Sequence, residues 1–229
     1  MPTPPSIAFP LFPDMTQLDL TGPAQFLSGL GGPVAGVAAS RDPVQTDAGF
    51  AILPTATFAE VAAADILCVP GGTGVTAAIE DDATLGWVRE VGGGARWVTS
   101  VCTGALLLGA AGLLRGYRAT THWAWHDELA QFGAEPVRAR TVVDRNRVTG
   151  GGVTAGIDFA LTLIGEAAGA GTARLIQLAL EYDPAPPFDA GSPERAGPAL
   201  VAEYHRRAAR LAPGRVQALR AAAVRRGFG

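Results

Sequence analysis

Lysine is absent from the 229-residue chain, and all 18 of its basic residues are arginines. Together with the abundance of alanine and glycine, this absence indicates a bias of genome composition rather than a function. Only two cysteines are present, Cys68 and Cys102, and they form no C-x-x-C pair. The chain also opens without a basic and then apolar signal segment. These absences predict a reducing, cytoplasmic location.

No apolar run reaches transmembrane length without an intervening glycine, proline or charge, so no membrane partner is expected. Apolar residues make up 48% of the chain, which is enough to bury a substantial core. The length suits one large α/β domain, and no internal repeat is visible. We therefore expect a single domain over residues 1–229, with a flexible lead-in at 1–5 and a basic helical segment at 199–229.

The basic charge is concentrated near the C-terminus. Residues 195–229 carry eight arginines and one glutamate, a net charge of +7, which leaves −10 on residues 1–194 for the total of −3. The pattern over 199–226 predicts one amphipathic helix or a pair broken at Pro213-Gly214. Such a segment can bind nucleic acid, or it can present a solvated face while packing against an acidic body. We favour the second interpretation, and expect no nucleic acid partner, because aromatic residues are not regularly interleaved with the arginines.

Apolar strand-like runs alternate with helix-like runs along most of the chain. This order predicts an α/β fold, a flavodoxin-like three-layer sandwich with an open, mostly parallel sheet. The run at 65–70 is continuously apolar, as in strands covered on both faces. We expect strands at 6–12, 33–39, 65–70 and 96–99, hairpins at 44–54 and 137–149, and helices at 23–30, 58–61, 81–92, 105–114, 122–132, 154–168 and 172–182.

Cys102 lies between a predicted strand and a predicted helix, with Ser100 and Gly104 two residues to either side. Small neighbours around such a residue are typical of a nucleophile elbow, in which the turn is tight and its backbone strained. The N-terminus of the following helix would lower the pKa of the thiol and favour the reactive thiolate. The alternative is a buried structural cysteine, because free cysteine is among the most buried residue types.

Three glycine-rich strand ends converge on one edge of the predicted sheet. They are Gly71-Gly72, the Cys102 elbow and the glycines at 150–152, and the loop that carries Asp19 follows the first strand to the same edge. Ligands of open α/β sheets bind beyond the carboxyl ends of the strands. The convergence therefore favours a catalytic Cys102.

Several segments together resemble one protein family. They are residues 18–23, 70–75, 99–104, 119–126, 149–161 and 180–188. The chain resembles the DJ/PfpI branch of the class I glutamine-amidotransferase-like superfamily and, within it, the isocyanide hydratases. The resemblance implies a homodimer that hydrates a small-molecule isocyanide to a formamide without a metal or organic cofactor. It also places Asp19 where most of the superfamily has glutamate.

The residues can support that chemistry. Cys102 would attack the isocyanide carbon and form a thioimidate, while Asp19 would transfer protons and activate water. Thr103 would orient these groups, and the Gly72 N–H would bind developing negative charge together with the Thr103 N–H. The alternatives are that Asp19 caps a helix starting near Pro23, that Thr103 is a first-turn residue and that Gly72 is a turn glycine.

Weaker candidates follow Cys102 in the chain. His122 would serve as a base for the thiol or as a satisfied polar residue, Gly151 belongs to the glycine turn, and Trp123 would line a pocket for the isocyanide substituent or pack in the core. His126, four residues after His122, lacks the further ligands that a zinc site needs. Three other functions keep a reactive cysteine: a glyoxalase or deglycase, a ligand-sensing regulatory domain, and an oxidation sensor.

Overall fold

A computed structural model describes residues 3–228 of the chain, and its centre is a seven-stranded sheet in the order β10-β11-β7-β6-β1-β2-β5. All neighbouring strands pair in parallel except β10 and β11, which form an antiparallel hairpin at one edge. The strands are β1 (Ile7–Pro10), β2 (Val34–Ala38), β5 (Ala56–Thr57), β6 (Ile66–Val69), β7 (Trp97–Val101), β10 (Thr141–Asp144) and β11 (Arg147–Gly150).

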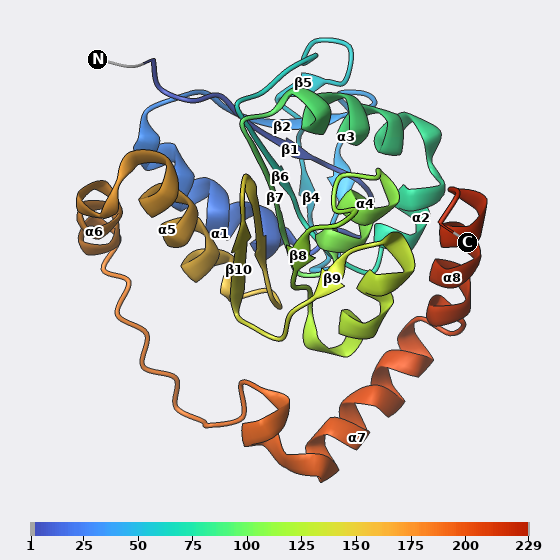
Figure 1. Cartoon of the computed structure of the whole chain (residues 1–229). Helices are drawn as coiled ribbons and strands as arrows, with labels where there is room; N and C mark the ends of the chain where they lie inside the picture. The colour runs from blue at the N-terminus through green and yellow to red at the C-terminus, as the bar shows by residue number, and fades with distance from the viewer. Residues whose placement is uncertain (1–2, 229) are drawn as a thin grey trace.

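Helices cover both faces of this sheet (Figure 1), which confirms the predicted three-layer α/β fold. One layer contains α1 (Gln17–Leu27), α5 (Ala155–Ala168) and α6 (Ala170–Ala179), and the other contains α2 (Val75–Glu80), α3 (Asp82–Gly94), α4 (Gly104–Ala110), the 3-10 helix η2 (Trp123–Phe132) and α8 (Arg215–Arg225). The central strands β1 and β6 are buried at every position because helices pack on both of their faces.

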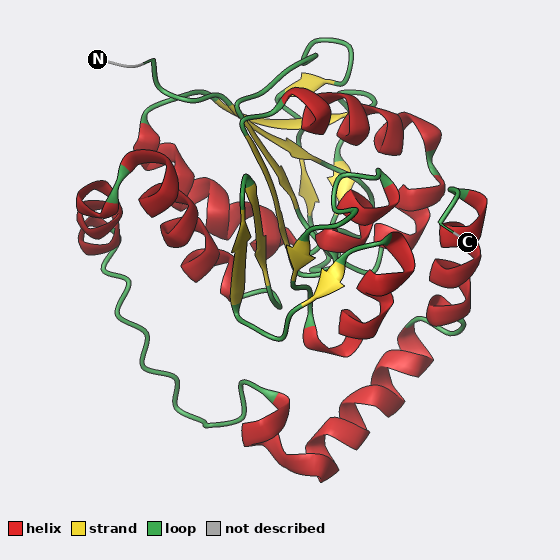
Figure 2. Ribbon diagram, in the orientation of Figure 1, coloured by secondary structure: helices red, strands yellow, loops and turns green. Residues whose placement is uncertain are grey.

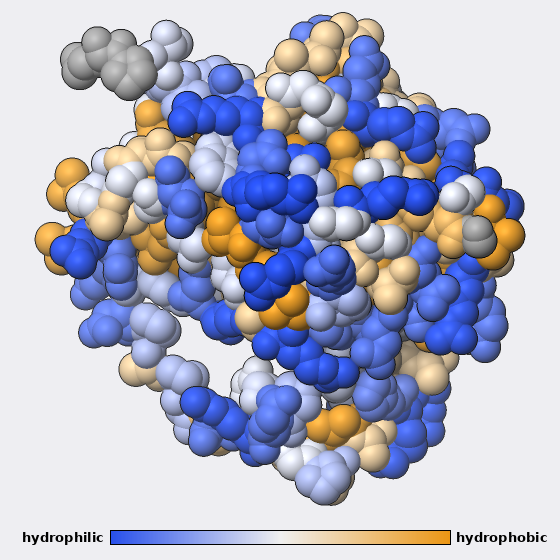
Figure 3. Space-filling view, in the orientation of Figure 1, coloured by the Kyte–Doolittle hydropathy of each residue, from blue (hydrophilic) through white to orange (hydrophobic). Residues whose placement is uncertain are grey.

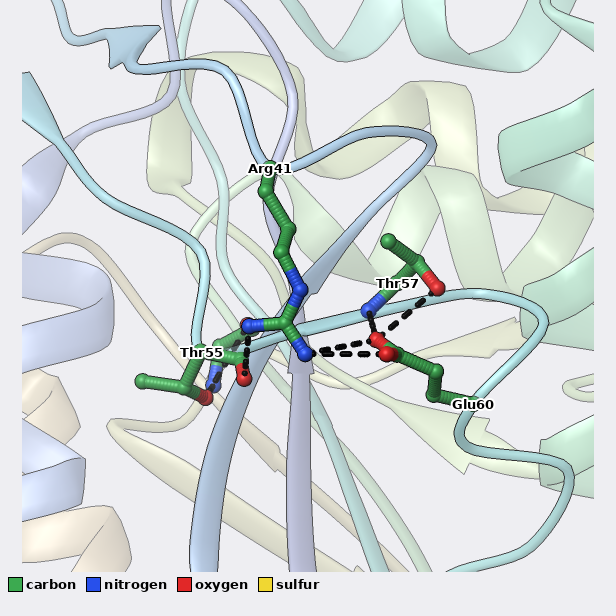
Figure 4. Close-up of polar contacts among 5 residues, drawn as sticks. Arg41, Thr55, Thr57 and Glu60 are labelled. Carbon is green, nitrogen blue, oxygen red and sulfur yellow. Dashed lines mark hydrogen bonds and ion pairs between the residues drawn. The ribbon is translucent and has the colours of Figure 1, made fainter.

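Short elements complete the fold around the sheet (Figure 2). They are η1 (Ser28–Leu30), the hairpin β3 (Val44–Gln45) and β4 (Ala51–Ile52), and the pair β8 (Arg118–Ala119) and β9 (Glu135–Pro136). Side-chain hydrogen bonds stabilise the edge of the sheet near β5 (Figure 4). Arg41 donates to the Thr55 carbonyl and to the Glu60 carboxylate, and this carboxylate also accepts from the Thr57 N–H. Residues 58–60 form a turn here, so the helix predicted at 58–61 is wrong.

Two predicted helix boundaries also differ from the structure. Helix α1 begins at Gln17 rather than near Pro23, with Thr16 at its N-cap position, and Pro23 lies inside the helix. Helix α2 was not expected. The segment after Cys102 is shorter than predicted, because α4 ends at Ala110 and a series of turns follows.

The C-terminal segment leaves the body and then returns to it. After α6 an extended linker (residues 183–192) leads to α7 (Pro193–Leu211), which is kinked at Gly197, and then to α8 (Figure 1). Helix α8 is joined to the acidic body by ion pairs from Arg220 to Glu128, Arg225 to Glu80 and Arg226 to Asp82. These contacts confirm the prediction of a helix pair, broken at Pro213-Gly214, that packs against an acidic body.

Residues 1 and 2 of the predicted lead-in, and Gly229, lie outside the described residues, whereas Thr3–Pro5 have no regular secondary structure. Over residues 3–228, no helix has both the length and the apolar character needed to cross a bilayer.

Candidate active site

Cys102 occupies a strained turn between β7 and α4. Its φ angle is +56°, in the left-handed region that a residue with a Cβ atom rarely adopts. Its N–H points to the carbonyl oxygens of Gly150 and Gly151 at 3.1 and 2.8 Å, and its carbonyl accepts a 2.7 Å bond from Thr121 Oγ1. A Cβ atom at Gly104 would lie 2.2 Å from the Val69 oxygen, so this neighbour must be small. The structure therefore confirms the predicted elbow.

Asp19 lies beside this elbow, in the first turn of α1. Its side chain is fully buried, and Oδ2 accepts a 2.9 Å hydrogen bond from the Gly71 N–H. A Cβ atom placed on Gly71 would lie 2.8 Å from both the Asp19 Oδ2 and the Cys102 Cβ, which shows how closely the carboxyl and the elbow approach. Because Asp19 follows the N-cap residue by three positions, the alternative that it caps a helix near Pro23 is wrong.

Burial controls the ionisation of this pair. It raises the pKa of Asp19 from 3.8 to about 7, against the opposing effect of the Gly71 hydrogen bond. Burial and then the negative charge of Asp19 raise the pKa of the Cys102 thiol, although the N–H groups of Val153 and Thr103 oppose this shift. The net lowering of the thiol pKa predicted from the helix N-terminus is therefore wrong. Since two like charges cannot share the site, the pair carries at most one negative charge, which it gains as the pH rises through about 7.

Thr103 connects the elbow to the turn after β6. Its Oγ1 accepts the Gly72 N–H at 3.0 Å and donates to the Gly72 carbonyl oxygen at 3.1 Å. Gly72 has a φ angle of +133°, and a Cβ atom there would lie 2.4 Å from the Asp14 oxygen, so only glycine fits. In this structure Thr103 engages the Gly72 N–H that we expected to bind an anionic intermediate. The Thr103 N–H points to the sulfur instead.

His122 does not pair with Cys102. Its Nδ1 accepts a 3.2 Å hydrogen bond from the Ala124 N–H, and no hydrogen bond joins it to the sulfur among residues 3–228. Its pKa is lowered to about 4, first by burial and then by the positive charge of Arg215, so the ring is neutral at pH 7. The predicted alternative of a satisfied polar residue therefore describes His122 better than a base. Gly151 contributes its carbonyl oxygen to the elbow.

Two residues of the C-terminal helices lie at the site and were not predicted from the sequence. Arg215, at the start of α8, donates a 2.7 Å hydrogen bond to the Gly72 carbonyl oxygen, and its guanidinium lies 4.4 Å from the centre of the Trp125 ring. Tyr204 of α7 stacks on His122 and packs at a tilt against Trp123, and its pKa is raised first by burial and then by the charge of Cys102. No sequence signal indicates which of eight C-terminal arginines is buried.

Trp123 lines two adjoining cavities. One, of about 310 Å³, is bounded by Tyr204 and residues 190–193, and the other, of about 350 Å³, extends to Thr121, Gly151 and Gly152. The side chain therefore borders open space, as expected for a pocket residue. Within residues 3–228, no group of three or more histidine, cysteine or acidic side chains is arranged to hold a metal ion.

Comparison with known proteins decides the family. A sequence model described as the DJ-1/PfpI family matches residues 5–166, which include the elbow, Asp19 and the glycine turns. This chain belongs to the DJ-1/PfpI family. A crystal structure of a ThiJ/PfpI family protein from Pseudomonas syringae superposes with a TM-score of 0.90 and 46% identity, over 96% of this chain and 91% of the other.

Within the family, the chain is 55% identical to a protein named isonitrile hydratase from Pseudomonas putida, over 89% of this chain and 90% of that protein. The transcriptional regulator GbdR of Pseudomonas aeruginosa is 34% identical over 51% of this chain, but the match covers only 32% of the regulator. The similarity to the hydratase thus extends over almost the whole of both chains, whereas the similarity to the regulator is confined to part of each.

Proposed function

We propose that this DJ-1/PfpI protein hydrates isocyanides, R–N≡C, to N-substituted formamides. The observation that carries the proposal is the buried Cys102–Asp19 pair beside a strained elbow, in which the pKa of the carboxyl is raised to about 7, so that it can both give and take a proton. The 55% identity to the Pseudomonas putida isonitrile hydratase supports the same reaction. Isocyanide and isonitrile are two names for the same functional group.

In the first half-reaction, the sulfur of Cys102 forms a bond to the terminal carbon of the isocyanide. This carbon is a soft electrophile, and a thiolate is a soft nucleophile. Asp19 transfers the proton of the pair to the same carbon, which gives the thioimidate R–N=CH–S–Cys. The proton shared by the pair thus becomes the hydrogen of the future formyl group.

In the second half-reaction, ionised Asp19 removes a proton from water as the oxygen attacks the thioimidate carbon. Asp19 passes this proton to the nitrogen, the carbon–sulfur bond breaks, and the proton of the new hydroxyl group returns to the Cys102–Asp19 pair. The products are R–NH–CHO and the original site, so one water is consumed for each isocyanide. Thr103 and the Gly151 carbonyl support this sequence by holding the elbow and the Gly72 peptide in place.

The proposal is tested with a small aryl isocyanide in oxygen-18 water, with the formamide followed by mass spectrometry. Wild type should produce labelled formamide, and Cys102→Ser should not. Cys68→Ser is the matched control, because Cys68 is fully buried within β6 and should not take part. A folded, fully reduced wild type that forms no formamide would reject the hydratase function in favour of dicarbonyl or oxidation chemistry.

We propose that the cavity of about 310 Å³ beside Trp123 receives the R group. Its lining includes Trp123 and Tyr204, and the centres of these two rings are 4.7 Å apart. The pKa of the Tyr204 hydroxyl is raised by burial and then by a negative charge on Cys102. Aromatic walls are suited to apolar substituents. The reaction itself needs no redox-active group, which is why no organic cofactor or metal belongs to the proposal.

We also propose that the protein works as a homodimer. Helix α6 exposes Leu175 and Leu178 at 68% and 77%, and the extended linker exposes Phe188 at 81%. Leu175 and Leu178 are three positions apart on α6, where Figure 3 shows hydrophobic side chains at the surface, and exposed apolar patches are typical of surfaces that associate. Light scattering after size exclusion should give about twice the 23.4 kDa chain mass, and Leu178→Glu should reduce it if α6 lies in the interface.

Two further parts of the proposal concern the whole chain. We propose that residues 1–229 act as one domain, which the ion pairs between α8 and the body support. We also propose a cytoplasmic location, because the reaction requires a reduced Cys102 and both cysteines are free thiols.

A further inference from the structure

Arg215 is an unusual arginine in this chain because it is buried. Only 8% of the residue is exposed, whereas the side chains of Arg220 and Arg225 on the same helix are more than half exposed. Within the described residues 3–228, Arg215 forms no ion pair with a carboxylate, and its Nε is buried without a hydrogen-bond partner. A buried cation without a counterion is costly, so some other negative charge is expected nearby.

The polar groups next to Arg215 belong to the candidate active site. Its Nη2 donates a 2.7 Å hydrogen bond to the carbonyl oxygen of Gly72, the same oxygen that accepts from Thr103 Oγ1. The neighbouring peptide donates the Gly71 N–H to Asp19, so the two peptides of this turn connect Arg215 with both the carboxyl and the elbow. Burial lowers the pKa of the Arg215 guanidinium, and a negative charge on Cys102 opposes that shift.

We propose that Arg215 is a positioning residue of the active site, which fixes the Gly72 peptide and balances the single negative charge of the Cys102–Asp19 pair. Arg215 lies outside residues 5–166, the part that the family model matches, so the role belongs to the C-terminal helices rather than to the family core. This role would explain why the C-terminal segment is basic. Only the expected effect of Arg215 on isocyanide hydration rests on the proposed function.

Other groups around the sulfur must be considered because they also affect its ionisation. Asp19 comes from α1, His122 from the loop before η2 and Tyr204 from α7, while Asp47 between β3 and β4 acts on Asp19. His122 is neutral at pH 7, and Tyr204 has a raised pKa. Among these groups Arg215 is therefore the one that is positively charged at neutral pH.

The test measures the rate at which iodoacetamide alkylates Cys102 between pH 5 and 10, followed on the Cys102 peptide by mass spectrometry. Arg215→Met should make alkylation roughly tenfold slower at each pH, which corresponds to a rise of about one unit in the pKa of the thiol. Arg215→Lys should restore the rate of alkylation because it restores the charge. Its lysine lacks the planar guanidinium, so hydration should still be slower than in wild type.

Arg220→Met is the matched control. It removes an ion pair from the same helix, to Glu128, without removing a group that contacts the Gly72 turn. It should lower the melting temperature and leave the alkylation rate unchanged at each pH. An unchanged rate in folded Arg215→Met, or an equal slowing in Arg220→Met, would overturn the proposal. Alkylation needs no isocyanide, so a wild type that makes no formamide would reject the hydratase function and leave this test valid.

Discussion

The backbone N–H of Gly71 donates a 2.9 Å hydrogen bond to Oδ2 of Asp19, and this is the one protein hydrogen bond that the carboxyl receives from the main chain in the described residues. The other oxygen, Oδ1, is buried without a hydrogen-bond partner of its own. A carboxyl that is fully buried and supported on one oxygen only is poorly solvated as an anion. Its pKa is therefore raised to about 7, where it can both donate and accept a proton.

The raised pKa predicts how Asp19 affects stability. In the unfolded chain Asp19 ionises near pH 3.8, whereas in the folded protein it keeps its proton until about pH 7. The unfolded state therefore binds fewer protons between these values, and the free energy of unfolding falls as the pH rises from 4 to 7. Asp19→Asn removes this dependence and keeps an acceptor for Gly71. Relative to that variant, wild type should lose up to about 4 kcal/mol across this window.

Urea denaturation of both proteins at one-unit pH intervals measures this difference. The two stability curves should converge near pH 4 and separate toward pH 7, with Asp19→Asn the more stable protein at neutral pH. Parallel curves would mean that the carboxyl does not carry a raised pKa in the folded state. The same variant should form no formamide, because an amide cannot exchange the proton.

Gly71→Ala should inactivate the enzyme through a steric effect at the centre of the site. The added Cβ would lie 2.6 Å from the Thr103 nitrogen and 2.8 Å from the Asp19 Oδ2 and the Cys102 Cβ, distances that force the backbone to move. A displacement of about 1 Å at reacting groups costs on the order of a hundredfold in rate. The measurement is the rate of formamide formation, with circular dichroism to confirm folding.

Gly93→Ala is the control for that substitution. Gly93 is exposed on α3, and a Cβ atom there has no neighbour within 4 Å. Replacing a helical glycine by alanine should stabilise the protein by about 0.5–1 kcal/mol and leave the rate unchanged. Full activity in Gly71→Ala would contradict the close approach of the three groups.

The sequence predicted the parts of this structure that depend on local pattern. Alternating apolar segments indicated the parallel sheet, and small residues around Cys102 indicated the strained elbow with φ +56°. Asp19 was expected at the same edge of the sheet because it follows the first strand. The start of α1 was placed too late, since Pro23 resembles a first-turn proline but is tolerated within the helix here.

Features that depend on tertiary contacts were not predictable in the same way. The sign of the Cys102 pKa shift depends on burial and on Asp19, which outweigh the nearby N–H groups. Arg215 lies 143 residues from Gly72, so no local pattern indicates their hydrogen bond. The Gly72 N–H was expected to face a ligand, but it donates its hydrogen bond to the Thr103 hydroxyl instead.

Thr103 should act through its hydroxyl, which makes two hydrogen bonds to Gly72. Thr103→Val keeps the shape of the side chain but leaves the buried Gly72 N–H without a partner, which costs about 1–3 kcal/mol of stability. It should also slow formamide formation, because the Gly72 peptide can move. Thr103→Ser retains the hydroxyl and should stay close to wild type in both measurements. Equal rates for the valine and serine variants would assign the role of this residue to its backbone N–H instead.

Trp123 should determine which isocyanides the enzyme prefers. Its ring borders the cavity of about 310 Å³ that we propose for the R group, and it packs against Tyr204. Trp123→Ala enlarges this cavity and removes an aromatic wall. Because an apolar contact in such a pocket is worth roughly 1–3 kcal/mol, KM for an aryl isocyanide should rise by about tenfold. A compact alkyl isocyanide makes fewer contacts with the ring and should be affected less.

The preference between the two substrates separates this role from a structural one. A variant that is merely less well folded should lose kcat for both substrates in the same proportion, whereas loss of a pocket wall changes the ratio of their kcat/KM values. Trp97→Phe is the matched control, because Trp97 starts β7 at the end of the strand opposite the elbow. That variant should leave the ratio unchanged. An unchanged ratio in Trp123→Ala would place the R group elsewhere, and the cavity of about 350 Å³ next to Gly151 would be the next site to test.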